Sequence, residues 1–161
     1  MTDRPVVLSL ALIEGVHLSR LVEDFRELVT TSREDADPAI DRLAPEVYPD
    51  DPDASRTFRE STRDDLLERR IADAAVVRDA LAGFSLDSDE LTEAEARAEQ
   101  EITIPTDALD AWLRTLTALR LVLASRLDIT GDDDHDVDDP RYGVYDWIGF
   151  RLEGLILAAD A

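Results

Sequence analysis

The sequence predicts a mainly helical single domain, a bundle of about four principal helices with at most a small two-stranded β element. Apolar side chains recur every three or four residues over four long segments, as they do on one face of an α-helix. Two short stretches, 6–10 and 102–104, instead have the β-branched, alternating character of strands. A chain of 161 residues with 44% hydrophobic residues suits one domain, so residues 1–161 are predicted to fold together.

The four helices are expected near residues 10–31, 55–82, 106–128 and 140–158. Four prolines in the first linker forbid a continuous helix there: Pro38, Pro45, Pro49 and Pro52. Residues 85–101 and 128–139 are acidic and are predicted to be solvated, mobile segments, although the first could also hold an exposed helix. Because short linkers favour antiparallel neighbours and these linkers are long, the topology stays open.

The segment 112–127, WLRTLTALRLVLASRL, has the strongest character of a core helix. Its apolar face, at 100° per residue, comprises Leu109, Trp112, Leu116, Leu119, Leu123 and Leu127. Arg120 and Arg126 fall within the same face, and Arg70 falls within the apolar stripe of the preceding long helix. A buried guanidinium group without a partner would be strongly destabilising. The sequence therefore predicts a buried polar network that includes these three arginines.

Glu14 and Asp146 are the best candidates for the carboxylates of this network, because each projects into or beside an apolar stripe. Glu14 also has a simpler interpretation, as a first-turn glutamate that the helix dipole favours. If Arg120 is buried and paired, the substitution Arg120→Met should lower thermal stability. A solvent-exposed Arg120 with no carboxylate in reach would contradict the hypothesis.

The composition excludes several kinds of function. All 17 basic residues are Arg, and the net charge is −21 at pH 7. Nucleic-acid binding depends on neutralising phosphates with basic side chains, so direct contact with DNA is not expected. The chain has no Cys, which excludes disulfides, thiol switches and cysteine zinc sites. Because it also has a single Met, partner affinity should be unchanged by mild peroxide treatment.

No catalytic residues, cofactor or metal site are expected. The chain lacks the Ser/His/Asp, Cys/His, P-loop and dinucleotide fingerprints. The stretch 128–139, DITGDDDHDVDD, lacks the Asp spacing and final Glu of a calcium loop, and His135 within it is a weak metal candidate. No apolar run of membrane-spanning length and no signal-type N-terminus is found, so a cytoplasmic protein without membrane contact is expected.

The last predicted helix carries two apolar stripes. The first, Tyr145, Ile148, Leu152, Leu155 and Ile156, would pack on the 112–127 helix. The second comprises Trp147, Phe150, Gly154 and Leu157 and exceeds what one intramolecular contact needs. Since exposed apolar patches mark interfaces, we predict a homodimer through this second stripe. The alternative is that the acidic connector or residues 43–48 cover the stripe within one chain.

Five stretches carry a resemblance to a known family: LSLALIEGVHLSRL at 8–21, RLAPEVYPDD at 42–51, FR at 58–59, the segment 112–127, and YDWIGF at 145–150. In this order they resemble the DUF2017 proteins, found mainly in actinobacteria. The chain departs from the family at Thr117 and Ala118, where Asn-Asp is usual, and at Ala124, where Gly is usual. One branch is described as an oxidative-stress transcriptional regulator that acts with an alternative sigma factor and senses oxidants through a cysteine pair. That sensor cannot be carried over to a chain without Cys.

The resemblance and the composition together indicate a non-enzymatic regulatory or adaptor module that binds another protein. An acidic surface would steer it to a basic partner. The resemblance implies a DNA-binding protein such as a sigma factor, in a transcriptional stress response. The alternative is an anion-sensing or enzymatic domain built on Glu14, Arg70, Arg120 and Arg126. A deep pocket ringed by these arginines would favour that alternative.

Overall fold

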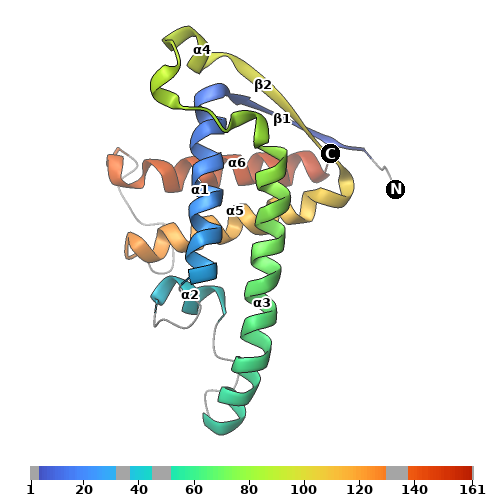
Figure 1. The fold of residues 1–161 in the computed structure, drawn as a ribbon, viewed down its shortest axis with the longest axis vertical. Helices are drawn as coiled ribbons and strands as arrows, with labels where there is room; N and C mark the ends of the chain where they lie inside the picture. The colour runs from blue at the N-terminus through green and yellow to red at the C-terminus, as the bar shows by residue number, and fades with distance from the viewer. Residues whose placement is uncertain (1–3, 32–36, 45–51, 130–137, 161) are drawn as a thin grey trace.

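A computed structural model describes residues 4–31, 37–44, 52–129 and 138–160, with the side chains of α3 described from Thr62 onward (Figure 1). Its elements are β1 (Val6–Ala11), α1 (Leu12–Thr31), α2 (Pro38–Leu43), α3 (Pro52–Ala80), α4 (Glu93–Arg97), β2 (Glu99–Ile104), α5 (Thr106–Arg126) and α6 (Gly143–Asp160). Three short 3-10 helices complete them: η1 (Ala82–Phe84), η2 (Ser88–Glu90) and η3 (Pro140–Tyr142). The fold is mainly helical, with four principal helices and a two-stranded sheet, which confirms the predicted class.

The four principal helices form two crossing layers (Figure 1). α1 and α3 run side by side in one layer, and α5 and α6 pack together in the other. α5 contacts all three of the other principal helices, and it also contacts α2. This central position explains why α5 has the clearest core pattern in the sequence.

The two strands pair antiparallel, with Val6 opposite Ile104 and Ala11 opposite Glu99. Alternate side chains of β1 face the core, so Val6, Leu8 and Leu10 are buried while Val7 and Ser9 between them are exposed. Both strands are longer than the sequence indicated, and the first helix starts at Leu12 rather than near residue 10. The pairing holds the backbone extended as far as Ala11, where the period-2 pattern ends.

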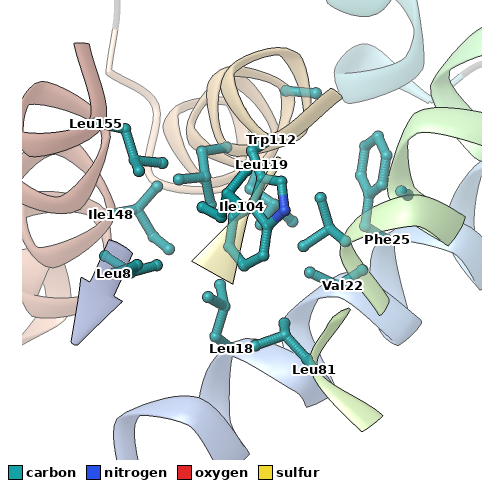
Figure 2. Close-up of a cluster of buried hydrophobic side chains, with 14 of the residues drawn as sticks. Leu8, Leu18, Val22, Phe25, Leu81, Ile104, Trp112, Leu119, Ile148 and Leu155 are labelled. Atoms are coloured by element: carbon teal, nitrogen blue, oxygen red, sulfur yellow. The ribbon is translucent and has the colours of Figure 1, made fainter. Parts of the chain in front are cut away.

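Trp112 of α5 is fully buried at the centre of the core (Figure 2). Side chains from both layers and from the sheet surround it, among them Leu18, Val22, Leu81, Ile104, Ile148 and Leu155. One core therefore holds the two helical layers and the sheet together.

A close approach joins η1 to α1. An ideal Cβ on Gly15 would lie 2.0 Å from a ring carbon of Phe84. Phe84 is buried at 5% exposure, so its ring has little room to move aside. Gly15 therefore lets the segment after α3 close over the first helix.

The two acidic segments differ in what the model describes. Within 85–101, Thr92 and Glu95 form a reciprocal capping box that starts α4, and β2 begins at Glu99. Most side chains of this segment are exposed. Residues 130–137 of the second segment lie outside the described residues, so the calcium-like stretch and His135 are not placed. The mobility expected of both segments stays a prediction.

Two other helices also start at residues that differ from the sequence expectation. α3 is one continuous helix from Pro52 to Ala80, so the second predicted helix starts earlier than residue 55. The last helix starts at Gly143 rather than 140, because Asp139 caps the separate turn η3 by accepting the N–H of Arg141.

Candidate functional site

A cluster of Glu14, Trp147 and Arg151 joins α1 to α6. Nη2 of Arg151 donates to the two carboxylate oxygens of Glu14 at 2.9 and 2.6 Å, and Nε donates at 3.2 Å. Nε1 of Trp147 donates to the same carboxylate at 2.7 Å, and the Ala11 N–H does so at 3.2 Å. The Glu14 and Arg151 side chains are 25% and 22% exposed, so the pair is largely shielded from water.

Glu14 reaches this position because it stands in the first turn of α1, three residues after Ala11 ends β1. A carboxylate there satisfies a backbone N–H at the helix start and is favoured by the helix dipole. Trp147 and Arg151 are four residues apart in α6 and so share one side of that helix. Both interpretations of Glu14 therefore apply, and the arginine that pairs with it is Arg151 of α6.

Burial raises the pKa of Glu14, but the hydrogen bonds from Arg151, Trp147 and Ala11 outweigh burial and hold the pKa below its usual 4.5. The group is therefore ionised at neutral pH. Both of its oxygens already accept hydrogen bonds, which leaves little capacity for a ligand cation or for a proton taken from a substrate. The cluster serves as a structural joint between the first and last helices.

A groove of about 450 Å³ opens beside this joint, between α1 and the start of α6. Its lining residues are Ile13, Glu14, His17, Arg20, Leu21, Gly143, Val144 and Trp147. The walls are mostly apolar, with His17 and Arg20 as the exposed polar side chains. Arg70, Arg120 and Arg126 do not line this groove, so it is not the arginine-ringed pocket that would favour an anion sensor.

Arg120 stacks on α6. Its guanidinium carbon lies 4.3 Å from the centroid of the Tyr145 ring. An ideal Cβ on Gly149 would lie 3.0 Å from its Nε, so the absence of a side chain at Gly149 makes room for the guanidinium. The YDWIGF stretch thus contributes to two arginine environments: Tyr145 and Gly149 contact Arg120, and Trp147 belongs to the Glu14 cluster. Asp146 lies beside Tyr145 in the first turn of α6 and is partly exposed.

Arg126 lies in a different place from the one expected. It is exposed at the end of α5, and two of its nitrogens donate to the two carboxylate oxygens of Asp37 at 2.9 Å each. Asp37 also caps α2 by accepting the Ala39 N–H at 2.9 Å. The hydrogen bond from Arg126 is the largest effect on the pKa of Asp37 and lowers it. Burial opposes this effect, and further hydrogen bonding lowers the pKa as well. Arg126 therefore pairs with a carboxylate at the surface, not in a buried network.

Arg70 occupies a third location, between α3 and α5. It is partly buried, and its Nε has no hydrogen-bond partner within the described part of the chain. Burial lowers the pKa of Arg70, which the nearby Asp73 partly offsets. Asp73 itself is paired with Arg114 of α5 at 2.8 and 3.1 Å. Of the predicted network residues, Glu14, Arg126 and Arg70 thus lie at three different helix contacts.

The outer face of α6, defined by Trp147, Phe150, Gly154 and Leu157, is the second candidate site. Phe150 and Leu157 are 67% and 64% exposed, and Gly154 is exposed between them. Trp147 is partly buried, and its indole N–H donates a hydrogen bond to Glu14 of the same chain. Two of the four predicted interface side chains are thus large, apolar and open to solvent. The predicted homodimer stays a prediction.

Sequence patterns did not reveal two residues of these sites, Arg151 and Asp37. Arg151 lies four residues after Trp147 on the same side of α6, but its sequence position does not show that Glu14 would lie opposite. Asp37 did have a signal, because an Asp directly before Pro38 is a typical helix cap. Its second role, as the partner of Arg126, depends on how α2 meets α5.

Within the ranges that the model describes, no group of three or more His, Asp or Glu side chains could hold a metal ion. Every described helix is too short or too polar to span a bilayer. Comparison with curated proteins and with solved structures gives no significant match. The profile of a domain of unknown function, DUF2017, matches residues 1–159, which includes both the Glu14 cluster and the outer face of α6. The chain therefore belongs to the DUF2017 family.

Proposed function

We propose that the protein is a non-enzymatic regulatory or adaptor module that binds another protein through the outer face of α6. The observation that carries this proposal is the exposure of Phe150 and Leu157, two large apolar side chains one heptad apart on a single helix. Aromatic side chains are enriched at interface centres, and an exposed apolar surface is a typical site of protein contact. The groove beside Trp147 extends this apolar surface toward α1.

A non-enzymatic role is supported by the state of the charged residues. Glu14 is the carboxylate that lines the groove, and its oxygens already accept hydrogen bonds from Arg151, Trp147 and Ala11. Arg120 is stacked on Tyr145, and Arg126 is paired with Asp37. Side chains committed to the fold in this way are poorly placed for acid–base chemistry. An anion-sensing or enzymatic domain remains the alternative proposal, and none of these contacts favours it.

The expected partner is a basic protein, because a net charge of −21 would attract one and slow the approach of acidic proteins. Family resemblance suggests a DNA-binding protein such as a sigma factor, with a role in a transcriptional stress response and no contact with nucleic acid by this chain. The cytoplasm is the proposed location. The apolar N-terminal stretch suits this, because it packs in the core as β1.

A comparative capture experiment tests the proposal. Immobilised wild-type protein and the variant Phe150→Asp/Leu157→Asp are incubated with extract of the native host at native salt. We expect a protein that the wild type retains and the variant loses. The control Asp64→Arg/Asp65→Arg changes two exposed residues of α3 and should retain the same protein. Equal capture by wild type and the Phe150/Leu157 variant would contradict the proposal.

A further inference from the structure

The outer face of α6 has the chemistry of a surface for one particular kind of partner. We propose that it accepts a basic amphipathic helix of another protein, and that the groove between α1 and α6 receives a large apolar side chain of that helix. This inference rests on the proposed function and adds the chemical class of the partner.

The spacing of the exposed residues indicates a helical occupant. Trp147 and Gly154 are seven residues apart, as are Phe150 and Leu157, and the two pairs alternate three and four residues apart along α6. This is the spacing with which one helix packs along another in a straight seam. A flat sheet or an extended peptide would not require it.

Gly154 supports close approach by a second backbone. A Cβ at this position would meet no heavy atom within 4 Å, so the chain's own packing does not require a glycine. Glycine inside a helix costs about 0.5–1 kcal/mol relative to alanine. A partner helix that approaches the seam closely at Gly154 explains why that cost is tolerated.

The groove continues the seam toward α1. Trp147 belongs to both surfaces, and Val144, one turn earlier, lines the groove and is 46% exposed. The volume of about 450 Å³ gives room for a large apolar side chain. Since Arg151, Trp147 and Ala11 already bind the Glu14 carboxylate, the groove offers apolar contact rather than a free charge.

Charge identifies the partner as basic. Glu153 and Asp160 are exposed and seven residues apart, so they line one edge of the seam over its C-terminal half. The opposite edge carries Val144, Arg151 and Ala158, and Arg151 is already bound to Glu14. A partner helix therefore gains most from Arg or Lys beside its own apolar stripe.

The same arrangement disfavours a second copy of this chain. In an antiparallel pair of α6 helices, the edges that carry Glu153 and Asp160 would face each other, and like charges across such a contact repel. In a parallel pair these acidic edges would face the edge of Arg151, whose guanidinium is held by Glu14. Each copy would also bring a charge of −21. The homodimer is thus the weaker occupant on electrostatic grounds.

Binding of designed peptides to the full chain tests the proposal. The probe is a labelled helical peptide as long as α6, with Leu at the a and d positions of each heptad and Arg at the e and g positions. Its matched control has Glu in place of Arg, and in both peptides the like charges oppose self-association. Affinity is measured by fluorescence anisotropy at moderate salt for wild type, Glu153→Arg/Asp160→Arg, Phe150→Asp/Leu157→Asp, and the charge control Asp64→Arg/Asp65→Arg.

We expect the Arg peptide to bind the wild type and the charge control, and the Glu peptide to bind neither. Glu153→Arg/Asp160→Arg should weaken the affinity for the Arg peptide by at least about tenfold and allow the Glu peptide to bind. Phe150→Asp/Leu157→Asp should abolish binding of the Arg peptide. Circular dichroism of each variant confirms that it is folded.

Three outcomes would overturn the inference. An equal loss in the charge control means that bulk charge alone attracts the peptide. Equal binding of both peptides, lost in the Phe150/Leu157 variant, would keep the docking face of the proposed function but reject a basic partner. If the wild type is a dimer in sedimentation equilibrium and Phe150→Asp/Leu157→Asp is a monomer, the outer face of α6 binds a second copy of this chain and not a basic helix.

Discussion

Two ion pairs of this protein have the same contacts and different surroundings. Arg151 and Arg126 each bind both oxygens of a carboxylate, Glu14 and Asp37 respectively. The carboxylates of both pairs are shielded, with Glu14 25% and Asp37 16% exposed, but the Arg151 side chain is 22% exposed and the Arg126 side chain is 48% exposed. Trp147 adds its N–H to the first pair, whereas Asp37 of the second also caps α2. The comparison teaches that the cost of losing a pair depends on how water can replace it, which bond geometry alone does not show.

The largest effect is expected from Glu14→Ala. The substitution removes the acceptor for Arg151, Trp147 and Ala11 at once and leaves a shielded guanidinium without its carboxylate. The free energy of unfolding should fall by about 2–4 kcal/mol. Urea denaturation monitored by circular dichroism measures it, and Glu14→Gln, which keeps one acceptor oxygen, should lose less. Unchanged stability of Glu14→Ala would show that the joint contributes nothing.

The pH dependence of stability distinguishes the contribution of the Glu14–Arg151 pair from that of the other interactions in the chain. Burial raises the pKa of Glu14, but hydrogen bonding lowers it by more than burial raises it, so the folded-state pKa lies below 4.5. A group of this kind contributes stability above its unfolded pKa and loses that contribution as the pH falls through its folded pKa. The difference in melting temperature between wild type and Glu14→Gln should therefore shrink between neutral pH and a pH well below 4.5. A constant difference would contradict the role of ionised Glu14.

Arg120→Met is expected to have an intermediate effect, because it removes the stacking of a guanidinium group on an aromatic ring. Its cation–π contact with Tyr145 should be worth about 1–2 kcal/mol in a partly buried setting. Thermal denaturation measures the loss, and Arg120→Lys serves as control because it keeps the charge without the planar stacking. If Arg120→Met had the same melting temperature as wild type, Arg120 would make no contribution to stability.

The smallest effect is expected from Asp37→Asn. Asparagine can still cap α2, so the substitution removes the ion pair with Arg126 and keeps the cap. A loss below about 1 kcal/mol is expected, and added salt should reduce it further. Asp37→Ala removes the cap as well and should cost about 1 kcal/mol more. If Asp37→Asn instead matched Glu14→Ala, the contrast between the two pairs would be wrong.

Most of the fold could be predicted from the sequence because it is recorded in periodicity. The stripe around Trp112 identifies the central helix, and the alternation around Leu8 identifies a strand. Periodicity gives the direction of a side chain but not the depth of cover along a helix. Arg126 follows the same stripe as Trp112. It is, however, the last residue of α5, and there its side chain is exposed although α2 packs against α5. For this reason the expectation that it is buried was wrong.

The partner of Glu14 could not be predicted for a related reason. Trp147 and Arg151 are more than 130 residues away in the sequence, and their meeting with α1 depends on how the two helical layers cross. The long linkers that left the topology open also left this contact open. The outer face of α6 was easier to identify, because Phe150 and Leu157 exceed what the inward stripe of one helix requires.

The pairing of β1 with β2 has a consequence for synthesis of the chain. Ala11 pairs with Glu99, so a ribosome completes the first strand long before it makes the second. At about 5–20 residues per second, the intervening chain takes roughly 5–20 s to appear. During that time Leu8 and Leu10 have no β2 to pair beside, while α1 and α3 can already form. β1 is thus made well before the strand that it pairs with, and a nascent chain cut before β2 would display an apolar strand.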